Sequence, residues 1–413
     1  MTIDITVLSI QFVLVVLLWI ALSVYGFSVG WWLLETTFFA RGWRPAASSE
    51  WELADVQVRI LTVDAAGVLK QTVESIPEAV DSVHVVAERP IEVEGATVHV
   101  VPDDFECDAT NKGRAVEWAR RHIGGDTEYV LYLDEDTIVT GLSGIPDADF
   151  VQFTEKPIYT GSRMSYLCEV FRTGYQFEQF GFHRLRYPLY AWGGGFAVRR
   201  SIEEAVTWDV PTVTEDTNFI WRAARKRSID YQLVDARFRN QAPPSLWAMV
   251  KQRRRWMSGT LRDADILPAW YRPIYGTRIV AWAFSPFVPV LLIVAYFLPG
   301  SVSGIHAYTW VATALLSILF LYMAAGALAY RKHPALWPVY LLLTPVAVFL
   351  HSLGAIWGVL RPAEVFEVTE KVEPEILEEL NEGLAEGDLD EHDGTERLVR
   401  DSPEDFDRSL FTD

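Results

Sequence analysis

Long uncharged stretches near both ends dominate the hydropathy pattern of this chain. No charged residue occurs from Ile5 to Leu34, and none occurs between Arg278 and Arg331. The first stretch is long enough to cross a hydrocarbon core of about 30 Å. Residues 1–40 therefore predict an N-terminal transmembrane helix. A cleaved signal peptide is the alternative, but it would begin with basic residues and have a shorter apolar run.

The second uncharged region predicts two or three further spans within residues 271–361. Two apolar runs, at about 279–298 and 308–330, are separated by a Pro-Gly-Ser sequence. A third run, at about 337–360, contains two prolines and either spans the membrane or re-enters it.

Basic residues next to the apolar runs predict the orientation. Arg41 and Arg44 follow the first span, and Arg331 and Lys332 follow the second of the C-terminal runs. Lys and Arg are enriched on the cytoplasmic side of membrane proteins. We therefore expect a multi-pass protein of the cell membrane in which the domain between the apolar regions, residues 50–270, is cytoplasmic.

Between the apolar regions, residues 50–270 have the pattern of a soluble α/β domain. Alternating or compact apolar runs at 56–63, 82–86 and 129–133 predict strands, and residues 112–122 predict a helix. Strands that alternate with helices indicate a mostly parallel sheet. Ligands bind such sheets beyond the carboxyl ends of the strands.

Charge is concentrated at the C-terminus. Of the formal net charge of −19, most comes from residues 361–413, which hold 19 Asp and Glu but only five Lys and Arg. Residues 362–413 therefore predict an acidic, largely disordered tail with a short helix near 373–385. The alternative is that this helix docks on the domain at residues 50–270. An acidic chain is a poor partner for nucleic acid.

Paired carboxylates follow the predicted strand at 129–133. Asp134 and Asp136 are two residues apart, and in an extended segment both would point to the same face. Carboxylate oxygens are the ligands that Mg²⁺ and Mn²⁺ prefer. An isolated Asp-x-Asp is more often a solvated turn, but the preceding strand and the motifs downstream favour a metal site.

A second acidic pair, Glu215 and Asp216, precedes a predicted helix at 218–227. Such residues are favoured at a helix N-terminus by the helix dipole, which is the simpler explanation. In this context we predict that Asp216 is a general base that takes a proton from an acceptor hydroxyl.

Two further motifs could contact substrate. In the sequence at 252–256, Gln-Arg-Arg-Arg-Trp, an Arg offers paired donors to phosphate oxygens and the Trp could line an acceptor channel. The alternative is a basic patch at the membrane surface. Trp192 and Gly193 begin a glycine-rich sequence in which Trp192 could stack on a sugar; the alternative is an ordinary turn before a strand.

In combination, these motifs resemble the membrane-bound family 2 glycosyltransferases, which include cellulose and hyaluronan synthases. The resemblance covers residues 52 to about 262 and is closer to the egghead-type β-1,4-mannosyltransferase branch. It implies a GT-A fold, a Rossmann-like α/β domain flanked here by transmembrane helices. It also implies three groups of site residues: donor-binding Glu88, Lys112, Asp134 and Arg255; metal-binding Asp134 and Asp136; and acceptor-side Trp192, Gly193, Glu215, Gln252 and Trp256, with Asp216 as the base.

The resemblance implies an inverting, metal-dependent reaction. A hexose of the mannose or glucose type would pass from a GDP- or UDP-sugar to a lipid-linked or glycolipid acceptor, with Mg²⁺ or Mn²⁺ as cofactor. Two alternatives remain: a processive polysaccharide synthase, and a non-catalytic membrane scaffold or transport protein.

Overall fold

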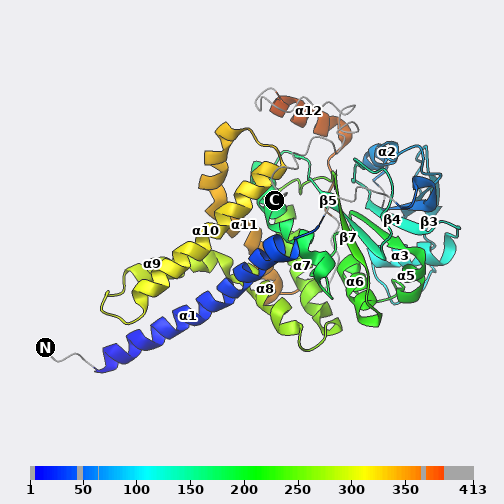
Figure 1. Cartoon of the computed structure of the whole chain (residues 1–413). Coiled ribbons are helices and arrows are strands. Elements are labelled where there is room, and N and C mark those ends of the chain that lie inside the picture. Colours follow the sequence, from blue (N-terminus) through cyan, green and yellow to red (C-terminus); the bar gives the residue numbers. More distant parts are fainter. Residues whose placement is uncertain (1–4, 44–49, 64, 364–368, 386–413) are drawn as a thin grey trace. The chain divides into compact units, whose positions relative to one another are not determined.

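A computed structural model of the 413-residue chain describes residues 5–43, 50–63, 65–363 and 369–385 (Figure 1). The chain forms two compact units, which we call the sheet unit and the helical unit. The sheet unit comprises the described residues of Arg41–Tyr166, Gln179–Ala248 and Val365–Asp413. The helical unit comprises the described residues of Met1–Ala40, Leu167–Glu178 and Met249–Glu364.

A seven-stranded mixed sheet forms the centre of the sheet unit, with strand order β3-β2-β1-β4-β6-β5-β7. Neighbouring strands are parallel except at β6, which runs antiparallel to both β4 and β5. This confirms the predicted α/β class. The strands are β1 (Val56–Thr62), β2 (Ser82–Ala87), β3 (Thr97–Val100), β4 (Tyr129–Asp134), β5 (Phe150–Glu155), β6 (Gly195–Arg199) and β7 (Tyr231–Phe238).

The central strands are buried on both faces. Every residue of β1 is buried, and β4 is buried as far as Leu133. Val58, Ile60 and Leu131 belong to the main hydrophobic core. Strands covered on both faces read as continuous apolar runs. Burial decreases at Asp134, where β4 reaches the edge of the sheet.

Helices and short helical turns pack around this sheet, and α3 contacts both β1 and β2. The helical elements are η2 (Leu53–Asp55), α2 (Ala66–Glu74), α3 (Lys112–His122), α5 (Arg200–Val206), α6 (Glu215–Lys226) and α12 (Pro374–Ala385). Three elements have residues in both units: α4 (Arg163–Tyr175), η3 (Gln176–Arg184) and α7 (Leu246–Asp263).

A buried ion pair joins β1 to α5. The guanidinium of Arg59 lies 3.4 Å from the carboxylate of Glu203, and both groups are fully buried. Arg59 also donates to the hydroxyl of Tyr132 at 2.8 Å, and Trp208 donates to Glu203 at 2.9 Å. Buried charges need this kind of pairing, because removing one partner leaves the other uncompensated.

The helical unit contains the apolar segments. Four of its helical segments are long and apolar enough to cross a membrane: Ile10–Phe39, Arg272–Tyr296, Ile305–Ala329 and Pro334–Leu360. They comprise α1 (Ile5–Leu33), η1 (Leu34–Phe39), α8 (Arg272–Phe284), η5 (Ser285–Phe287), α9 (Val288–Tyr296), α10 (Ile305–Ala329), η6 (Pro334–Leu336) and α11 (Trp337–Leu360). A short turn, η4 (Ala264–Ile266), follows α7.

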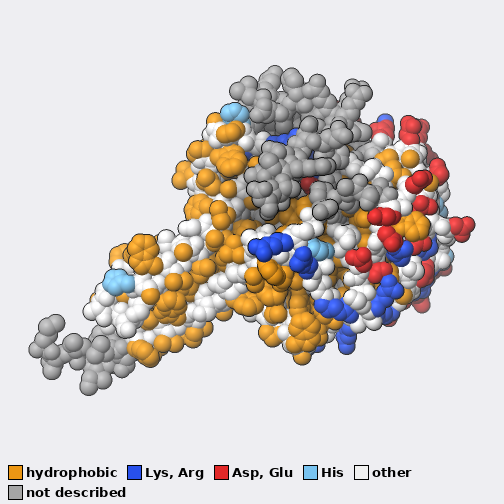
Figure 2. Space-filling model, in the orientation of Figure 1, with side chains coloured by type: hydrophobic (Ala, Val, Ile, Leu, Met, Phe, Trp, Pro, Cys, Tyr) orange, Lys and Arg blue, Asp and Glu red, His pale blue; other side chains and the backbone are white. Residues whose placement is uncertain are grey.

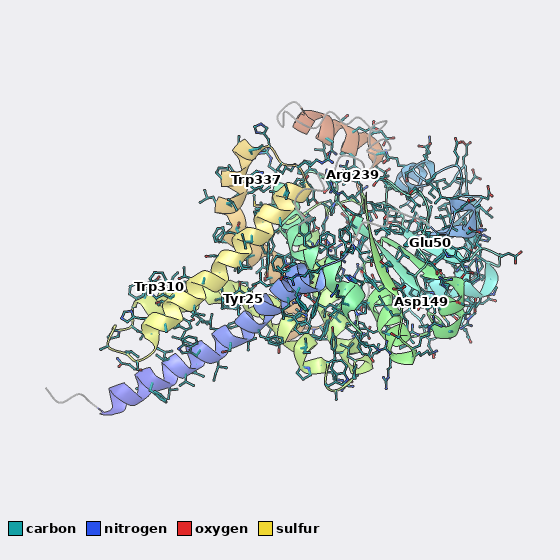
Figure 3. All side chains as sticks on the ribbon, in the orientation of Figure 1. Tyr25, Glu50, Asp149, Arg239, Trp310 and Trp337 are labelled. Atoms are coloured by element: carbon teal, nitrogen blue, oxygen red, sulfur yellow. The ribbon has the colours of Figure 1, made fainter. Side chains whose placement is uncertain are left out.

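Hydrophobic side chains lie uncovered along these helices (Figure 2). Phe12 on α1 is 68% exposed, and Trp310 on α10 is 78% exposed (Figure 3). Contiguous exposed apolar surface of this kind marks contact with a membrane or a partner.

Glycines allow two pairs of helices in this unit to approach at backbone distance. A Cβ atom at Gly326 of α10 would lie 1.8 Å from the carbonyl oxygen of Val170 on α4. A Cβ atom at Gly354 of α11 would lie 2.3 Å from the carbonyl oxygen of Val250 on α7. Small residues permit this packing between apolar helices.

A buried ion cluster also belongs to the helical unit. Arg278 of α8 lies 3.4 Å from the carboxylate of Glu35 in the π-helical η1. The guanidinium of Arg278 also pairs with Glu178. All three side chains are almost fully buried. Pairing offsets the cost of charge in an apolar environment, so the cluster joins η1, η3 and α8.

The acidic C-terminal region contains an ordered helix. We expected residues 362–413 to be largely disordered, with a short helix near 373–385; the structure has α12 at Pro374–Ala385. This helix contacts α2, and Leu377 is buried. The contact with α2 agrees with the alternative that this helix docks on the domain at residues 50–270. Residues 386–413 lie outside the described residues.

Candidate active site

The predicted site residues fall into two groups. One group, in the sheet unit, lies at or near the carboxyl ends of the parallel strands: Glu88, Lys112, Asp134, Asp136, Trp192, Gly193, Glu215 and Asp216. The other group, in the helical unit, lies on α7: Gln252, Arg255 and Trp256.

The ends of β1, β2 and β4 form one edge of the sheet. Thr62 at the end of β1 is paired in register with Ala87 of β2, and its neighbour Leu61 with Asp134 of β4. Asp134 at the end of β4 and Glu88 directly after β2 therefore lie at the same edge of the sheet.

Lys112 connects three parts of this site. Its ammonium lies 2.5 Å from Oδ1 of Asp134, 3.5 Å from Oε1 of Glu215 and 3.4 Å from the carbonyl oxygen of Gly193. Burial alone would lower the pKa of Lys112, but the carboxylates of Asp134 and Glu215 raise it above its ordinary value. The first residue of α3 is thus held in its charged form between the end of β4 and the start of α6.

Asp216 lies in the first turn of α6, next to this cluster. Its Oδ1 accepts a hydrogen bond from the backbone N–H of Thr217 at 2.6 Å. Burial raises the pKa of Asp216 to about 7, the charge of Glu215 adds to the increase, and Lys112 opposes it. A carboxylate with a pKa near neutral pH can accept a proton at that pH and is suited to general base catalysis.

The backbone of Gly193 lies close to the side chains of Asp216 and Lys112. A Cβ atom there would lie 2.9 Å from Oδ2 of Asp216 and 3.0 Å from Nζ of Lys112. The glycine thus lets the backbone approach both side chains closely.

Trp192 lies against the glycines that follow it. Cβ atoms at Gly194 and Gly195 would lie 2.6 Å and 2.8 Å from its indole ring. Gln152 holds the backbone of Trp192, accepting from its N–H at 2.9 Å and donating to its carbonyl oxygen at 3.1 Å. The glycines are therefore required by packing of this indole, and stacking of Trp192 on a sugar stays a prediction.

The chain turns immediately after Asp134. The N–H of Thr137 donates to the carbonyl oxygen of Asp134 at 3.1 Å, so residues 134–137 form a turn rather than continuing the strand. Asp134 and Asp136 have different partners in this turn. Oδ2 of Asp136 accepts from the backbone N–H of Gln241 at 2.9 Å and lies 2.7 Å from Nζ of Lys371.

Glu135, between the two aspartates, is bound within the fold. Its carboxylate accepts a hydrogen bond from the hydroxyl of Thr62 at 2.5 Å, and its carbonyl oxygen accepts one from Thr72 at 2.7 Å. Burial raises the pKa of Glu135. Its contacts join the turn to β1 and α2.

The carboxylates at this edge of the sheet could hold a divalent cation only together with ligands from a substrate. Within the described residues, no three His, Cys, Asp or Glu side chains form a group that could hold a metal ion. Asp136 is nearly fully buried and already has a cationic group, the Lys371 ammonium, against its carboxylate. Mg²⁺ is typically held by one or two carboxylates together with substrate phosphates. Asp134 and Asp136 would supply the two carboxylates of such an arrangement, and metal binding by them stays a prediction.

Glu88 has a partner that sequence reasoning missed. Arg114, in the first turn of α3, places its guanidinium 2.8 Å from Glu88 and donates to the carbonyl oxygen of Phe105 at 3.3 Å. The sequence signal was a second basic residue two positions after Lys112. Any ligand that reaches Glu88 would meet this ion pair.

In the helical unit, Arg253 rather than Arg255 is the fully buried arginine of the motif on α7. It pairs with Glu169, and its guanidinium carbon lies 4.0 Å from the ring centroid of Trp256. It also donates to the side-chain oxygen of Gln252 at 2.6 Å. Gln252 and Trp256 thus contact a buried ion pair, and their predicted role at the acceptor stays a prediction, as does donor binding by Arg255.

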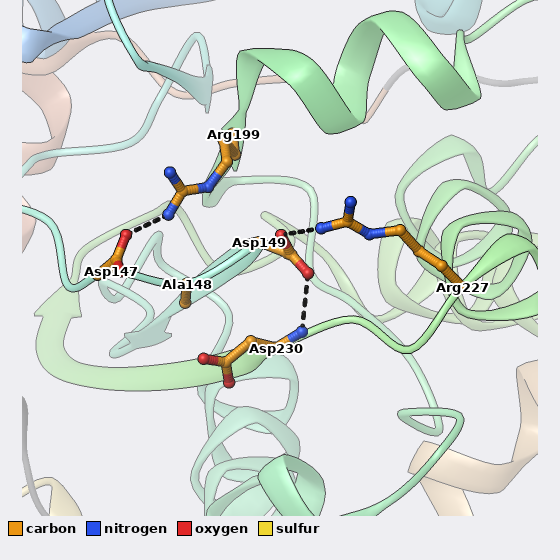
Figure 4. Close-up of a pocket in the computed structure, with 6 residues that line it drawn as sticks. All are labelled: Asp147, Ala148, Asp149, Arg199, Arg227 and Asp230. Atoms are coloured by element: carbon orange, nitrogen blue, oxygen red, sulfur yellow. Dashed lines mark hydrogen bonds and ion pairs between the residues drawn. The ribbon is translucent and has the colours of Figure 1, made fainter.

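A polar hollow of about 420 Å³ lies at the opposite edge of the same sheet (Figure 4). It is lined by Asp149 just before β5, Asp230 just before β7, and Arg199 at the end of β6. Arg199 pairs with Asp147, and Arg227 lies 2.6 Å from Asp149. These ion pairs tie the strand ends together, and the hollow contains none of the predicted site residues.

Comparison with known proteins identifies the class to which this arrangement belongs. Residues 129–330 match the family model described as glycosyl transferase family group 2. The solved structure of the mannosyltransferase PcManGT from Pyrobaculum calidifontis, in complex with GDP-Man and Mn²⁺, is similar with a TM-score of 0.50 and 14% identity; the match covers 83% of this chain and 99% of that one.

Two animal proteins are similar in sequence. The β-1,4-mannosyltransferase egh of Drosophila melanogaster is 23% identical over 317 residues, or 66% of this chain and 66% of the relative. The β-1,4-mannosyltransferase bre-3 of Caenorhabditis elegans is 23% identical over 210 residues, or 45% of this chain and 46% of the relative. The chain thus spans just under two thirds of the first relative and about half of the second.

These matches confirm the fold and the resemblance drawn from the motifs. Residues 129–330 match a family 2 glycosyltransferase model, and the chain is similar in fold to a GT-A mannosyltransferase.

Proposed function

We propose that this protein is an inverting, metal-dependent glycosyltransferase that moves a hexose from a nucleotide-sugar to a lipid-linked or glycolipid acceptor at the membrane. The observation that carries the proposal is Asp216, a partly buried carboxylate whose pKa is about 7 and which shares one site with Lys112. The other elements of the reaction follow from the residues around this pair.

Asp216 would act as the general base. The acceptor hydroxyl gives its proton to Asp216 while its oxygen bonds to the anomeric carbon of the donor. The bond from that carbon to the donor phosphate breaks in the same step, and the nucleoside diphosphate leaves. Attack opposite to the leaving group inverts the anomeric centre, and no covalent enzyme intermediate is required.

Lys112 and Asp134 would act on the donor side. The ammonium of Lys112 supplies a fixed positive charge at the edge of the sheet, 2.5 Å from Asp134. Preorganised charges of this kind stabilise negative charge that develops in the transition state. Glu88, with its partner Arg114, would contact the nucleoside part of the donor at the end of β2.

Asp134 and Asp136 would hold the divalent cation together with the donor diphosphate. When bound, such a cation neutralises the charge of the leaving nucleoside diphosphate. The PcManGT structure, which is similar in fold, contains Mn²⁺; this supports a divalent metal and makes Mn²⁺ and Mg²⁺ the ions to test.

The donor and acceptor are proposed from the relatives. Two sequence relatives are named β-1,4-mannosyltransferases, and the PcManGT structure contains GDP-mannose. GDP-mannose is therefore the first donor to test, and UDP-glucose is the second. Four helical segments apolar enough to cross a membrane support an acceptor carried by a lipid.

The sheet unit supports a specific membrane topology. It contains chain from both sides of the C-terminal apolar region, since Gln241 donates to the carbonyl oxygen of Val372 at 2.8 Å. We propose that the chain therefore crosses the membrane an even number of times between Arg272 and Leu360. Three candidate spans occupy this region: Arg272–Tyr296, Ile305–Ala329 and Pro334–Leu360.

We infer that α11 is the helix that does not cross the membrane completely. It contains Pro345, and its residue Gly354 contacts the backbone of α7. Two complete crossings then leave Arg331 and Lys332 on the same side as Arg41. The excess of basic residues on this side makes it the cytoplasmic one, so the catalytic domain would be cytoplasmic.

Transfer of label tests the function directly. Purified full-length protein in detergent is incubated with an extract of membrane lipids and either GDP-mannose or UDP-glucose, tritiated in the sugar, with and without Mn²⁺. The proposal predicts that one donor labels the lipid phase with one hexose per acceptor and only in the presence of the metal. Long polysaccharide products would favour a processive synthase, and neither transfer nor metal-dependent donor hydrolysis would favour a non-catalytic protein.

A further inference from the structure

Residues 369–381, which we call the C-terminal strap, cross the sheet unit close to the candidate metal site. Gln241 fixes the strap through its side-chain amide, which donates to the carbonyl oxygen of Val372 and accepts from its N–H, both at 2.8 Å. The backbone N–H of the same Gln241 donates to Asp136. One residue therefore holds both the strap and the carboxylate.

The helical part of the strap is anchored separately. Leu377 is 7% exposed, and a Cβ atom at Gly67 of α2 would lie 2.4 Å from the carboxylate of Glu373. Asn381 donates to the carbonyl oxygen of Tyr159 at 3.3 Å. These contacts hold the strap on the sheet unit without any contribution from Lys371.

Lys371 extends from the strap to the candidate metal site. Its ammonium lies 2.7 Å from Oδ2 of Asp136, whose side chain is 2% exposed, while the Lys371 side chain is 21% exposed. The same oxygen accepts the N–H of Gln241 at 2.9 Å. The ammonium is thus in the position that a cation bound to this oxygen would take.

From this geometry we propose that the C-terminal strap is an autoinhibitory plug, in which the Lys371 ammonium competes with the divalent cation for Asp136. The inference rests on the metal site of the proposed function. Mg²⁺ binds oxygen at about 2.0–2.1 Å and demands near-octahedral ligands, so Lys371 and the metal cannot share this oxygen in the same geometry. The two positive charges also repel each other.

The competition couples the strap to substrate binding. If the strap lowers the affinity of the site for metal, then metal must lower the affinity of the site for the strap by the same factor. A metal–donor complex, which brings more ligands than Asp136 alone, would displace Lys371 and loosen residues 369–372. The strap would thus keep the site closed until donor and metal arrive together.

Direct metal binding tests the competition. Mn²⁺ binding to the full-length protein in detergent is measured by electron paramagnetic resonance of the free ion, in the presence of GDP. Lys371→Met should bind Mn²⁺ roughly tenfold more tightly than the wild type. Lys70→Met, in an exposed ion pair with Glu74 on α2, is the control and should leave the affinity unchanged.

Hydrogen exchange provides a second readout that needs no turnover. The backbone amides of residues 369–372 should exchange faster after Mn²⁺ and GDP are added to the wild type. The proposal is overturned if amide exchange of the wild type does not change and Lys371→Met binds Mn²⁺ no more tightly than the wild type. Weaker Mn²⁺ binding by Lys371→Met would assign Lys371 to the donor instead.

Asp136→Asn separates this inference from the metal site itself. If the wild type binds Mn²⁺ and Asp136→Asn does not, the metal site stands and the behaviour of Lys371→Met alone decides the plug. If neither protein binds Mn²⁺ in the presence of GDP, the metal site of the proposed function fails, and the plug fails with it.

Discussion

The ammonium of Lys112 lies 2.5 Å from Oδ1 of Asp134, so the first residue of α3 forms an ion pair with the last residue of β4. The same ammonium lies 3.5 Å from Glu215, the residue before Asp216. A single cation therefore links the carboxylate proposed to bind metal and donor with the acidic pair proposed to act on the acceptor. Substitution of Lys112 should therefore affect both the donor side and the acceptor side of the site.

Removing the charge of Lys112 should shift the pH dependence of transfer. Because a base must be deprotonated, kcat/KM of the wild type should rise with pH and level off above about 7, the pKa of Asp216. Lys112 opposes the increase in that pKa. In Lys112→Met the acidic limb should therefore move to higher pH. An unchanged limb, or a shift to lower pH, in the profile of kcat/KM would contradict this coupling.

Adding a methyl group at Gly193 should slow transfer without unfolding the domain. The new Cβ atom would lie 2.9 Å from Asp216 and 3.0 Å from Lys112, so at least one of them must move. Displacement of a reacting group by about 1 Å can cost on the order of 10²-fold in rate. Steady-state transfer rates and thermal unfolding are measured for Gly193→Ala.

Gly124→Ala is the matched control for this change, because a Cβ atom at Gly124 meets nothing within 4 Å. It should keep the wild-type rate. If Gly193→Ala also turns over at the wild-type rate, the close approach of this glycine has no role in catalysis.

Several elements of the fold could be predicted from the sequence because their signals are local. The helix expected at 112–122 is α3, and the apolar run at 129–133 is β4, which ends at Asp134 as the motif required. Both signals depend on a few adjacent residues. The apolar run of β4 reflects burial of this strand on both faces of the sheet, and α3 packs against β1 and β2.

Contacts between residues distant in sequence could not be predicted in this way. Lys371 and Asp136 are far apart along the chain, and nothing near Lys371 in the acidic tail indicates that it faces a carboxylate. The prediction that residues 134–136 are extended was wrong for the same reason. The turn there is stabilised by Thr62 and Thr72, which belong to other elements.

The burial of the three adjacent arginines on α7 also could not be predicted from the sequence. The sequence offered three adjacent arginines and no basis for ranking their burial. Packing against Glu169 and Trp256 buries Arg253, and this depends on the placement of α4 relative to α7. We therefore expect Arg253 to act mainly on stability.

Arg253→Met should destabilise the protein. It leaves the buried carboxylate of Glu169 with Arg172 as its remaining charged partner, and breaking a buried pair costs about 3–5 kcal/mol. Arg272→Met removes an exposed pair with Asp265, for which the cost is about 0–1 kcal/mol. Thermal unfolding in detergent should show a clear loss of melting temperature for the first variant only; equal effects would contradict the role given to Arg253.

Cysteine accessibility should reveal two complete crossings in the C-terminal region. Single cysteines are introduced at Ser303, His333 and Thr369 in a variant whose Cys107 and Cys168 are replaced by alanine. In intact cells an impermeant maleimide should label only Ser303→Cys. Labelling at position 369 would mean that α11 crosses the membrane and that the strap cannot reach Asp136.

The role of Asp216 in transfer is the central claim, and one comparison tests it most directly. Wild type, Asp216→Asn and the control Asp230→Asn, whose substitution lies at the opposite edge of the sheet, are compared for Mn²⁺-dependent transfer of mannose from GDP-mannose to lipid and for donor affinity. Loss of a general base should lower the rate at saturating donor by about 10²–10⁴-fold in Asp216→Asn and leave donor affinity nearly unchanged. Wild-type turnover in Asp216→Asn, or a collapse of donor affinity with the saturated rate preserved, would contradict the account.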